Sequence, residues 1–304
     1  MNIKNKLITN GYVFALLATI LWSGNFIVAR DIKDIVDPYS LSFYRWLLAT
    51  IILLPFAIVP LIKNIVIVKR HFIYLSIVSI LGVSLFNTLI YVASHTSSAL
   101  NLSIISITFP IIVIIISRVI FKEHIGINKF TGILIVLAGV LLLITRGDIS
   151  VLVNITFNIG DLWVLLAAIS FAVYSILLRY KPKTLSMITF QLITFILGTI
   201  YLIPLFLWEF DTRVINEPTL NNTISILYIA ICSSLLAFIF WNKSIELLGA
   251  TKAGMIYYTL PIFTGSLAFI FLDEIISYVH LFSILLIFIG IYITNKNKNK
   301  KEIS

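Results

Sequence analysis

The sequence predicts an all-α polytopic membrane protein, with ten transmembrane helices arranged as two inverted five-helix repeats. Three observations support this prediction: the composition, the number of long apolar runs and the match between the two halves. Of the 304 residues, 60% are hydrophobic and 12% are charged, whereas a soluble protein averages about 45–50% apolar and about 25% charged residues. Because a membrane-spanning helix needs about 20 apolar residues, ten such helices leave no room for a sizeable soluble domain.

Continuous apolar runs, separated by charged or proline-marked breaks, are the candidates for the spans. Helices are favoured over barrel strands because the runs are continuously apolar and do not alternate. The first run is no ordinary signal peptide, since it lacks a clear small-residue cleavage site and other spans follow it. The predicted spans are residues 12–29, 38–62, 73–93, 99–121, 127–145, 161–178, 187–207, 222–242, 252–272 and 277–294.

The charges of the connecting segments predict the topology. If the N-terminus is cytoplasmic, the inside segments hold 17 of the 22 basic residues and the outside segments hold four. Positive charge favours cytoplasmic loops, so we expect a multi-pass protein of the inner (cytoplasmic) membrane with both termini in the cytoplasm. The net charge of +9 is then a topology signal, and we expect the lipid bilayer, not nucleic acid, as the partner.

The two halves of the chain, residues 1–147 and 148–304, align with each other at nearly constant offsets. The aligned pairs are Leu16–Ala18 with Leu165–Ala167 and Pro55 with Pro204 at an offset of 149, and Ala99 with Ala250, Pro110 with Pro261, Glu123 with Glu274 and Gly139 with Gly290 at an offset of 151. Each half holds five predicted spans. Because five is odd, the second half enters the membrane from the opposite side, which gives the inverted repeats that alternating access requires.

With ten predicted spans in an inverted five-plus-five repeat, the chain resembles the drug/metabolite transporter superfamily, EamA-type. The residues that carry the resemblance are Trp22-Ser-Gly-Asn-Phe26, Phe43-Tyr-Arg-Trp46, Leu247-Leu-Gly-Ala-Thr251 and the repeated alanine–proline–glutamate–glycine pattern. The second half departs from the family pattern, because Ser170-Phe-Ala-Val-Tyr174 replaces the tryptophan–glycine motif. The resemblance implies a ten-helix carrier, but not its solute, since such carriers move amino acids, other metabolites, nucleotide sugars or drugs.

Motifs for enzymatic chemistry are absent from the sequence. There is no HExxH, P-loop or glycine-rich nucleotide fingerprint, and the four histidines show no ligand spacing. We therefore expect neither a metal nor another cofactor, and no enzyme activity. Cys232 is the single cysteine, so an intramolecular disulfide is impossible.

The carboxylates all fall in loops or within about a turn of the predicted span ends. Proton-coupled carriers often use an intramembrane Asp or Glu as a relay. Its absence predicts facilitated diffusion, or exchange down the gradient of the solute, without a carboxylate relay.

Arg45 is the one charge deep in a predicted span, about seven residues after Pro38 and so roughly 10 Å into the membrane. A charge at the bilayer centre costs about 2.5–3.5 kcal/mol on insertion scales. Two interpretations remain open. Arg45 binds a carboxylate or phosphate of the solute, or it pairs structurally with helix-end carbonyls or with Asp31 or Asp34.

Uncharged polar and aromatic residues within the spans are the other candidates for the solute site, because a lone polar group facing lipid is costly. Asn87 and Tyr91 are four residues apart and share one helical face. Helix–helix hydrogen bonding is the alternative role for each candidate. The substrate-binding candidates are Trp22, Asn25, Arg45, Asn87, Tyr91, Tyr174, Gln191, Trp241, Tyr257 and Tyr258, with Asn101 and Asn242 as further polar residues.

A second group is expected to be structural or gating. Pro110 and Pro261 each free a backbone carbonyl and bend a helix. Gly139 and Gly290 let helices approach closely, for packing within the chain or at a dimer face. Glu123 and Glu274 are interfacial caps by default, with gating as the alternative.

Together these features predict an integral membrane transporter that exports small amino-acid-like metabolites by alternating access, as a monomer or homodimer. Within transport, the alternative is an importer or exchanger of anionic or nucleotide-type metabolites. Outside transport, the alternative is a membrane enzyme acting on a lipid-linked substrate, which would need clustered catalytic carboxylates or histidines.

Overall fold

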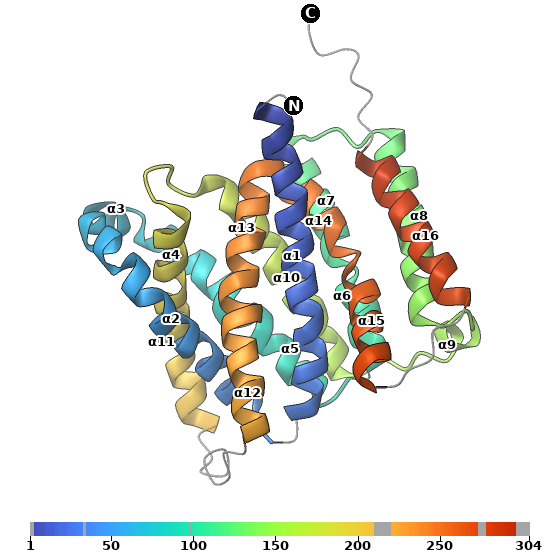
Figure 1. Ribbon diagram of the computed structural model, residues 1–304, viewed down its shortest axis with the longest axis horizontal. Helices are drawn as coiled ribbons and strands as arrows, with labels where there is room; N and C mark the ends of the chain where they lie inside the picture. Colours follow the sequence, from blue (N-terminus) through green and yellow to red (C-terminus); the bar gives the residue numbers. More distant parts are fainter. Residues whose placement is uncertain (1–2, 33–34, 98, 210–219, 273–277, 296–304) are drawn as a thin grey trace, which may run out of the picture.

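The computed structural model describes residues 3–32, 35–97, 99–209, 220–272 and 278–295, and these residues contain helices and no strands. Most helices run roughly along one direction, and α1 begins at the same end at which α16 ends (Figure 1). We call this the terminal end, and the opposite end the far end. The helices are α1 (Ile3–Ile32), α2 (Pro38–Lys63), α3 (Ile65–Arg70), α4 (Phe72–Ser79), η1 (Ile80–Leu85), α5 (Phe86–Ser94), α6 (Ala99–Ser106), α7 (Phe109–Phe121), α8 (Ile127–Ile144), α9 (Ser150–Val153), α10 (Ile159–Leu177), η2 (Leu178–Tyr180), α11 (Met187–Glu209), α12 (Leu220–Tyr228), η4 (Ile229–Leu236), α13 (Ala237–Leu248), α14 (Ala250–Tyr257), α15 (Leu260–Leu272) and α16 (Tyr278–Asn295).

Nine segments of the described residues are long and apolar enough to cross a membrane. They correspond to the predicted spans except the ninth, 252–272, which the structure divides into α14 and α15. The prediction of an all-α polytopic protein is therefore confirmed. Glu274, one of the predicted interfacial caps, lies outside the described residues.

Two helices are broken just before a proline. The break between α6 and α7 falls at Ile107–Thr108, and that between α14 and α15 at Tyr258–Thr259. Pro110 and Pro261 lack the N–H that would continue the preceding helix. At each break the threonine hydroxyl donates to a carbonyl of the preceding turn: Thr108 Oγ1 to that of Ile105, and Thr259 Oγ1 to that of Ile256. Polar groups of the irregular backbone thus find partners inside the protein.

Two π-helical segments, η1 and η4, interrupt the third and eighth spans. Such turns are rare and are frequently found at functional sites. Both are largely buried, and each places a serine hydroxyl against another part of the bundle: Ser84 Oγ donates to the carbonyl of Gly198 at 2.9 Å, and Ser234 Oγ accepts from Arg45 at 2.6 Å.

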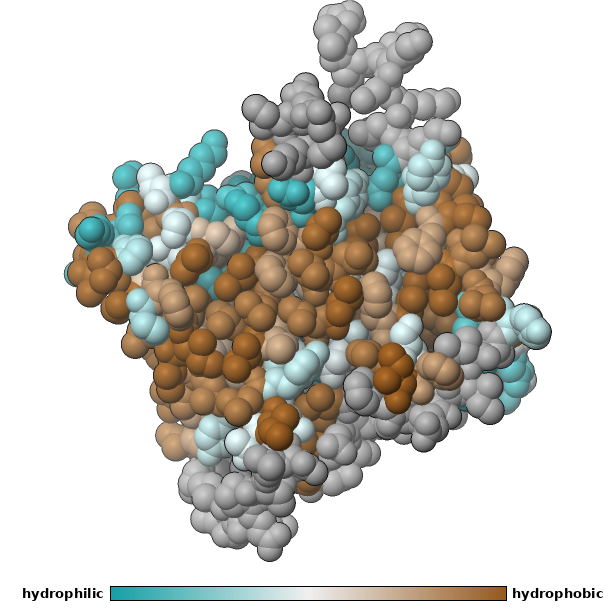
Figure 2. Space-filling model, viewed as in Figure 1, coloured by the Kyte–Doolittle hydropathy of each residue, from teal (hydrophilic) through white to brown (hydrophobic). Residues whose placement is uncertain are grey.

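The outer faces of the helices are apolar. Figure 2 shows hydrophobic residues over the middle of the bundle and hydrophilic residues gathered at the terminal end. Large side chains such as Phe56, Ile115 and Phe282 are each more than half exposed. Because exposed apolar area of this extent is unfavourable in water, it fits contact with lipid.

Glycines join α8 to α16 along one side of the bundle. A Cβ on Gly132 would lie 2.7 Å from the carbonyl oxygen of Gly290, and a Cβ on Gly290 would lie 2.7 Å from that of Gly132. Gly139 packs against Ser283 and Leu286 in the same interface. Small residues allow this close approach of backbones, so Gly139 and Gly290 pack helices within this chain.

We expect Gly132→Ala to destabilise the protein by about 1–3 kcal/mol, because the added methyl group overpacks a backbone contact that cannot yield. The midpoint of thermal unfolding in detergent measures the effect. Gly265→Ala is the matched control, since a Cβ at this helical glycine meets nothing within 4 Å. Equal melting temperatures for the two variants would contradict this account of the α8–α16 interface.

Candidate functional site

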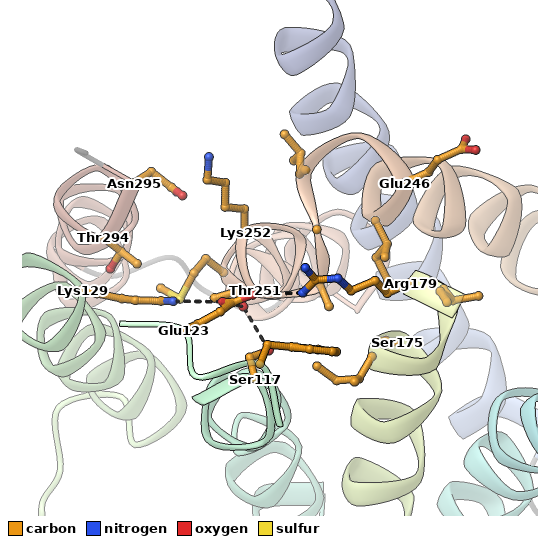
Figure 3. A pocket seen from close by; sticks show the side chains of 18 of the residues that line it. Ser117, Glu123, Lys129, Ser175, Arg179, Glu246, Thr251, Lys252, Thr294 and Asn295 are labelled. Atoms are coloured by element: carbon orange, nitrogen blue, oxygen red, sulfur yellow. Dashed lines mark hydrogen bonds and ion pairs between the residues drawn. The ribbon is translucent and has the colours of Figure 1, made fainter. Parts of the chain in front are cut away.

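A cavity of about 1860 Å³ opens at the terminal end of the bundle. Side chains from α7, α8, η2, α13, α14 and α16 surround it (Figure 3). Exposed residues such as His124 and Lys183 stand at its mouth, and buried residues such as Ser117, Asn242 and Met255 lie deeper. The cavity is larger than the roughly 300–1,000 Å³ of an ordinary ligand pocket and has the form of an open vestibule.

The vestibule carries an excess of positive charge, which favours the entry of anionic or zwitterionic solutes. Its cationic residues are Lys129, Arg179, Lys181, Lys183 and Lys252, and its carboxylates are Glu123 and Glu246. Lys181 Nζ donates to the carbonyl of Leu185 at 2.6 Å. Burial lowers the pKa of Lys181, and the nearby carboxylate of Glu246 acts in the opposite direction.

Glu123 connects several elements at the mouth of the vestibule. Its carboxylate lies 4.0 Å from Lys129 Nζ and 3.7 Å from Arg179 Nη1, and the hydroxyl of Thr251 lies 3.2 Å from Oε2. Arg179 and Thr251 belong to the second half of the chain, so Glu123 links the two halves at this end (Figure 3). Because the carboxylate is partly exposed, each ion pair is worth little, about 0–1 kcal/mol, and can part readily.

A buried polar chain lies at the floor of the vestibule. Tyr174 Oη donates to Asn242 Oδ1 at 2.8 Å, and Asn242 Nδ2 donates to Gln191 Oε1 at 2.6 Å. Gln191 Nε2 is buried without a hydrogen-bond partner. Beside this chain, Trp241 Nε1 donates to Ser175 Oγ at 3.2 Å. Ser175 and Asn242 face the vestibule, so its deepest part is polar.

Aromatic rings close the centre of the bundle beyond this floor. We call the set of Trp22, Phe109, Phe171, Phe238, Trp241 and Tyr257 the aromatic layer. Their ring centroids lie about 5–6 Å apart, as in the Trp22–Trp241 pair at 5.3 Å, and each ring is less than a tenth exposed. Trp22 Nε1 also donates to the carbonyl of Ser233 at 3.0 Å. The layer therefore separates the vestibule from the far end.

Arg45 lies on the far side of the aromatic layer and is fully buried. Its Nη1 donates to Asn87 Oδ1 at 3.1 Å and to Tyr91 Oη, and its Nε donates to Ser234 Oγ at 2.6 Å. Tyr91 Oη in turn donates to Asn25 Oδ1 at 3.3 Å. The guanidinium carbon lies 5.1 Å from the ring centre of Trp46, a favourable cation–π distance. These residues (Asn25, Arg45, Asn87, Tyr91 and Ser234) form the Arg45 network.

Apolar and polar contacts close the far end around this network. Ile32, Val36, Leu41, Tyr91 and Ile229 pack as one buried cluster. On the neighbouring α10, the buried carboxylate of Asp161 accepts hydrogen bonds from Ser97 Oγ, from Asn101 Nδ2 at 2.8 Å and from the backbone N–H of Asn158. Asn158 and Asp161 form a capping box at the start of α10.

The structure brings the predicted solute-binding residues together, but not along the open cavity. Asn25, Arg45, Asn87 and Tyr91 form one network, while Tyr174 and Gln191 form another with Asn242. Trp22, Trp241 and Tyr257 belong to the aromatic layer. Tyr258 is fully buried in the packing against α1 and α8, and Asn101 holds Asp161. Of the polar, solute-binding and gating candidates named from sequence, Asn242 and Glu123 line the vestibule.

Sequence reasoning missed most of the vestibule wall. Ser175, Thr251 and Lys252 line it, yet none of them is among the site residues that the sequence predicts. A usable signal existed, since the cations of the inside loops cluster between positions 179 and 183 and again at 252. Which of these face one another depends on helix packing, which local pattern does not encode.

Comparison with known proteins gives the family of this fold. The profile of the EamA-like transporter family matches residues 9–145 and again residues 158–296. The chain belongs to the EamA-like transporter family. Its two matched segments cover nearly the whole sequence, so this assignment applies to the complete bundle and its vestibule.

Individual relatives agree with this assignment, and a solved structure shows the same fold. An uncharacterized transporter from Archaeoglobus fulgidus is 27% identical, over 95% of this chain and 98% of the relative. The uncharacterized transporter YyaM from Bacillus subtilis is 25% identical over 86% and 85%, respectively. A protein crystal structure superposes with a TM-score of 0.75 at 14% identity, covers 94% of this chain and 96% of that chain, and shows the same fold. The protein is thus a multi-pass membrane transporter, as the sequence predicts.

Proposed function

We propose that this transporter exports small amino-acid-like metabolites across the inner membrane by alternating access, with both termini in the cytoplasm. In this proposal the terminal end faces the cytoplasm, and the structure represents the state that is open to the inside. The observation that carries the proposal is the asymmetry of the bundle. One end holds a solvent-connected vestibule of about 1860 Å³, and the other is closed around Arg45, which is fully buried.

An inverted repeat of residues 1–147 and 148–304 would supply the second state. Residues related by such a repeat meet near its axis, and several residues separated by 149 positions touch: the rings of Trp22 and Phe171 lie 5.5 Å apart, and those of Trp46 and Phe195 lie 4.7 Å apart. Thr50 Oγ1 and Thr199 Oγ1 are 3.4 Å apart. Contacts between equivalent residues support a two-fold relation, which allows the two halves to exchange inner and outer conformations.

Hydrogen bonds support the same relation. In the first half, Tyr91 donates to Asn25; in the second, Tyr174 donates to Asn242. At the offsets of 149 and 151, Asn25 corresponds to Tyr174 and Tyr91 corresponds to Asn242. The same tyrosine–asparagine bond therefore occurs in each half with the two residue types exchanged. Each bond lies within its own half of the chain, so each stiffens a unit that would move as a rigid body.

The chemistry of the vestibule supports an amino-acid-like solute. Its excess of cationic residues attracts a carboxylate, and its floor offers hydroxyl and amide groups such as those of Ser175 and Asn242. The aromatic layer behind the floor suits an apolar side chain. An importer or exchanger of anionic metabolites is the second candidate, which the positive vestibule also favours. The family and the names of its relatives indicate transport rather than enzymatic turnover.

The described residues place no carboxylate at the membrane midplane. The carboxylate of Asp161 is buried, but it lies in the first turn of α10, where it accepts hydrogen bonds from Ser97, Asn101 and the Asn158 N–H. This arrangement supports movement down the gradient of the solute without a carboxylate relay.

Cysteine labelling tests the orientation of the vestibule. In a background with Cys232→Ala, we expect Thr251→Cys to react with a membrane-impermeant thiol reagent from the cytoplasmic side, because Thr251 lines the open cavity and is partly exposed. Right-side-out and inside-out vesicles provide the two directions of approach. Equal or faster labelling from the outside would contradict the proposed inward-open state.

Two exposed serines serve as controls for this labelling. Ser186→Cys lies in the loop before α11 at the terminal end, and Ser150→Cys lies at the start of α9 at the far end. We expect the first to report the inside and the second the outside. A reversal of both would show that the topology, rather than the cavity, is assigned wrongly.

Counterflow in proteoliposomes tests the solute class. We expect unlabelled amino acids on one side to accelerate entry of a labelled amino acid from the other, with no acceleration by nucleotides. Dissipation of an imposed pH gradient should leave the rate unchanged for a solute whose protonation stays the same. Acceleration by nucleotides alone would favour the second candidate, and a rate that collapses with the pH gradient would refute relay-free transport.

A further inference from the structure

Arg45 is a buried cation whose bonding is incomplete. Asp31 and Asp34, its candidate partners from the sequence, have side chains that the structure does not describe. Among the described residues none supplies a carboxylate to Arg45, and its partners are the neutral groups of Asn87, Tyr91 and Ser234. Its Nη2 is buried without a hydrogen-bond partner, and so is Asn87 Nδ2. A buried charge without an ion partner and with an unsatisfied donor is costly. Because a buried, incompletely bonded charge is costly, its presence here indicates that the unpaired donors have a use.

The hydrogen bonds of the guanidinium divide it into a side held within the first half of the chain and a side that faces the second half. Nη1 is fixed by Asn87 and Tyr91, which belong to the same half of the chain as Arg45. The rings of Trp46 and Tyr91, whose centres lie 5.1 and 5.6 Å from the guanidinium carbon, also contact the guanidinium from within that half. Nε, by contrast, bonds to Ser234 of η4 in the second half. The edge formed by Nε and Nη2 is therefore held by one hydroxyl from the opposite half.

We propose that the Nε–Nη2 edge of Arg45 binds the carboxylate of the solute in the state that is open to the far side. This inference rests on the proposed function, because Ser234 must move away with the second half when the far end opens. Carboxylates bind arginine through two parallel N–H···O bonds, and this edge provides both donors. Ser234 would then replace the carboxylate as the far end closes, since its hydroxyl accepts from Nε in the closed arrangement.

The charge of the network favours a carboxylate over a phosphate. Arg45 brings one positive charge, and the groups around it, from Asn25, Asn87, Tyr91 and Ser234, are neutral. A carboxylate carries one negative charge and so balances the guanidinium. A phosphate ester carries about 1.5 to 2 negative charges at neutral pH and would need a second cation, which the described residues do not place in this network.

The test compares matched probes for binding and for transport by the full-length protein. Binding is read as a rise in the melting temperature of the purified transporter in detergent, with each amino acid or short monocarboxylate set against its amide, and phenylacetate set against phenyl phosphate. We expect at least one carboxylate to stabilise the protein and its amide to have no effect. Stabilisation by amides as strong as by carboxylates, or by phenyl phosphate alone, would overturn the inference.

Asn87→Asp is the decisive variant because it retains the shape of the side chain and the acceptor for Nη1. It supplies an internal carboxylate to Arg45, so we expect the melting temperature to rise and the KM for a carboxylate solute to increase by about tenfold or more, as two charge-assisted bonds are weakened. Counterflow measured with the carboxylate applied from the far side gives this KM. An unchanged KM in a folded, more stable variant would overturn the inference.

Two further variants separate binding from folding. Ser234→Ala removes the competing hydroxyl and should lower the far-side KM for carboxylates. Arg146→Lys, at an exposed arginine of the far end, is the matched control and should leave this KM unchanged. If the unaltered protein transports amino acids while Asn87→Asp and Ser234→Ala leave the far-side KM unchanged, the Arg45 site is refuted and the proposed function stands. If the unaltered protein shows no counterflow with any solute, the proposed function itself fails.

Discussion

The need to provide hydrogen-bond partners for a buried guanidinium, that of Arg45, determines how the far end of this transporter is packed. In an apolar bundle, a polar group that faces neither water nor lipid headgroups must find its partners within the protein. Arg45 makes the largest such demand, and its hydrogen-bond partners are Asn87 and Tyr91 of α5 and Ser234 of η4. The bond to Ser234 also holds η4 against α2, so in the proposed cycle this bond would form as the far end closes.

Polar bonds occur both within each half and between the halves. Within the halves, the Tyr91–Asn25 and Tyr174–Asn242 bonds are buried and stiffen the units. Between the halves, Arg45 bonds to Ser234 and Trp22 to the Ser233 carbonyl towards the far end, and Glu123 contacts Arg179 and Thr251 at the terminal end. Further bonds between the halves include Thr50 with Thr199, Ser84 with the Gly198 carbonyl and Asn101 with Asp161. An alternating-access cycle would have to break ties at one end while those at the other end hold, with the aromatic layer between the two ends.

The fold was predictable because its signals are local. Apolar runs and the prolines at the starts of α7 and α15 each act over a few residues, so the sequence predicts the spans and the breaks well. The cost of polar groups inside apolar spans also indicates that Arg45, Asn87 and Tyr91 need partners. Sequence could not place the vestibule, because whether Ser175 or Lys252 faces a cavity depends on the rotation of packed helices. Nor did it identify Asp161 as the partner of Asn101, a contact across 60 positions.

The distance between spin labels at each end, with and without solute, tests the central claim most directly. With Cys232 replaced by alanine, exposed positions Ile127 and Lys183 span the vestibule mouth, and exposed positions Ile35 and Ile224 span the far end. Alternating access predicts that a saturating transported solute populates a state in which the terminal-end distance shortens as the far-end distance lengthens. Distances that remain constant, or that lengthen together at both ends, would contradict the account.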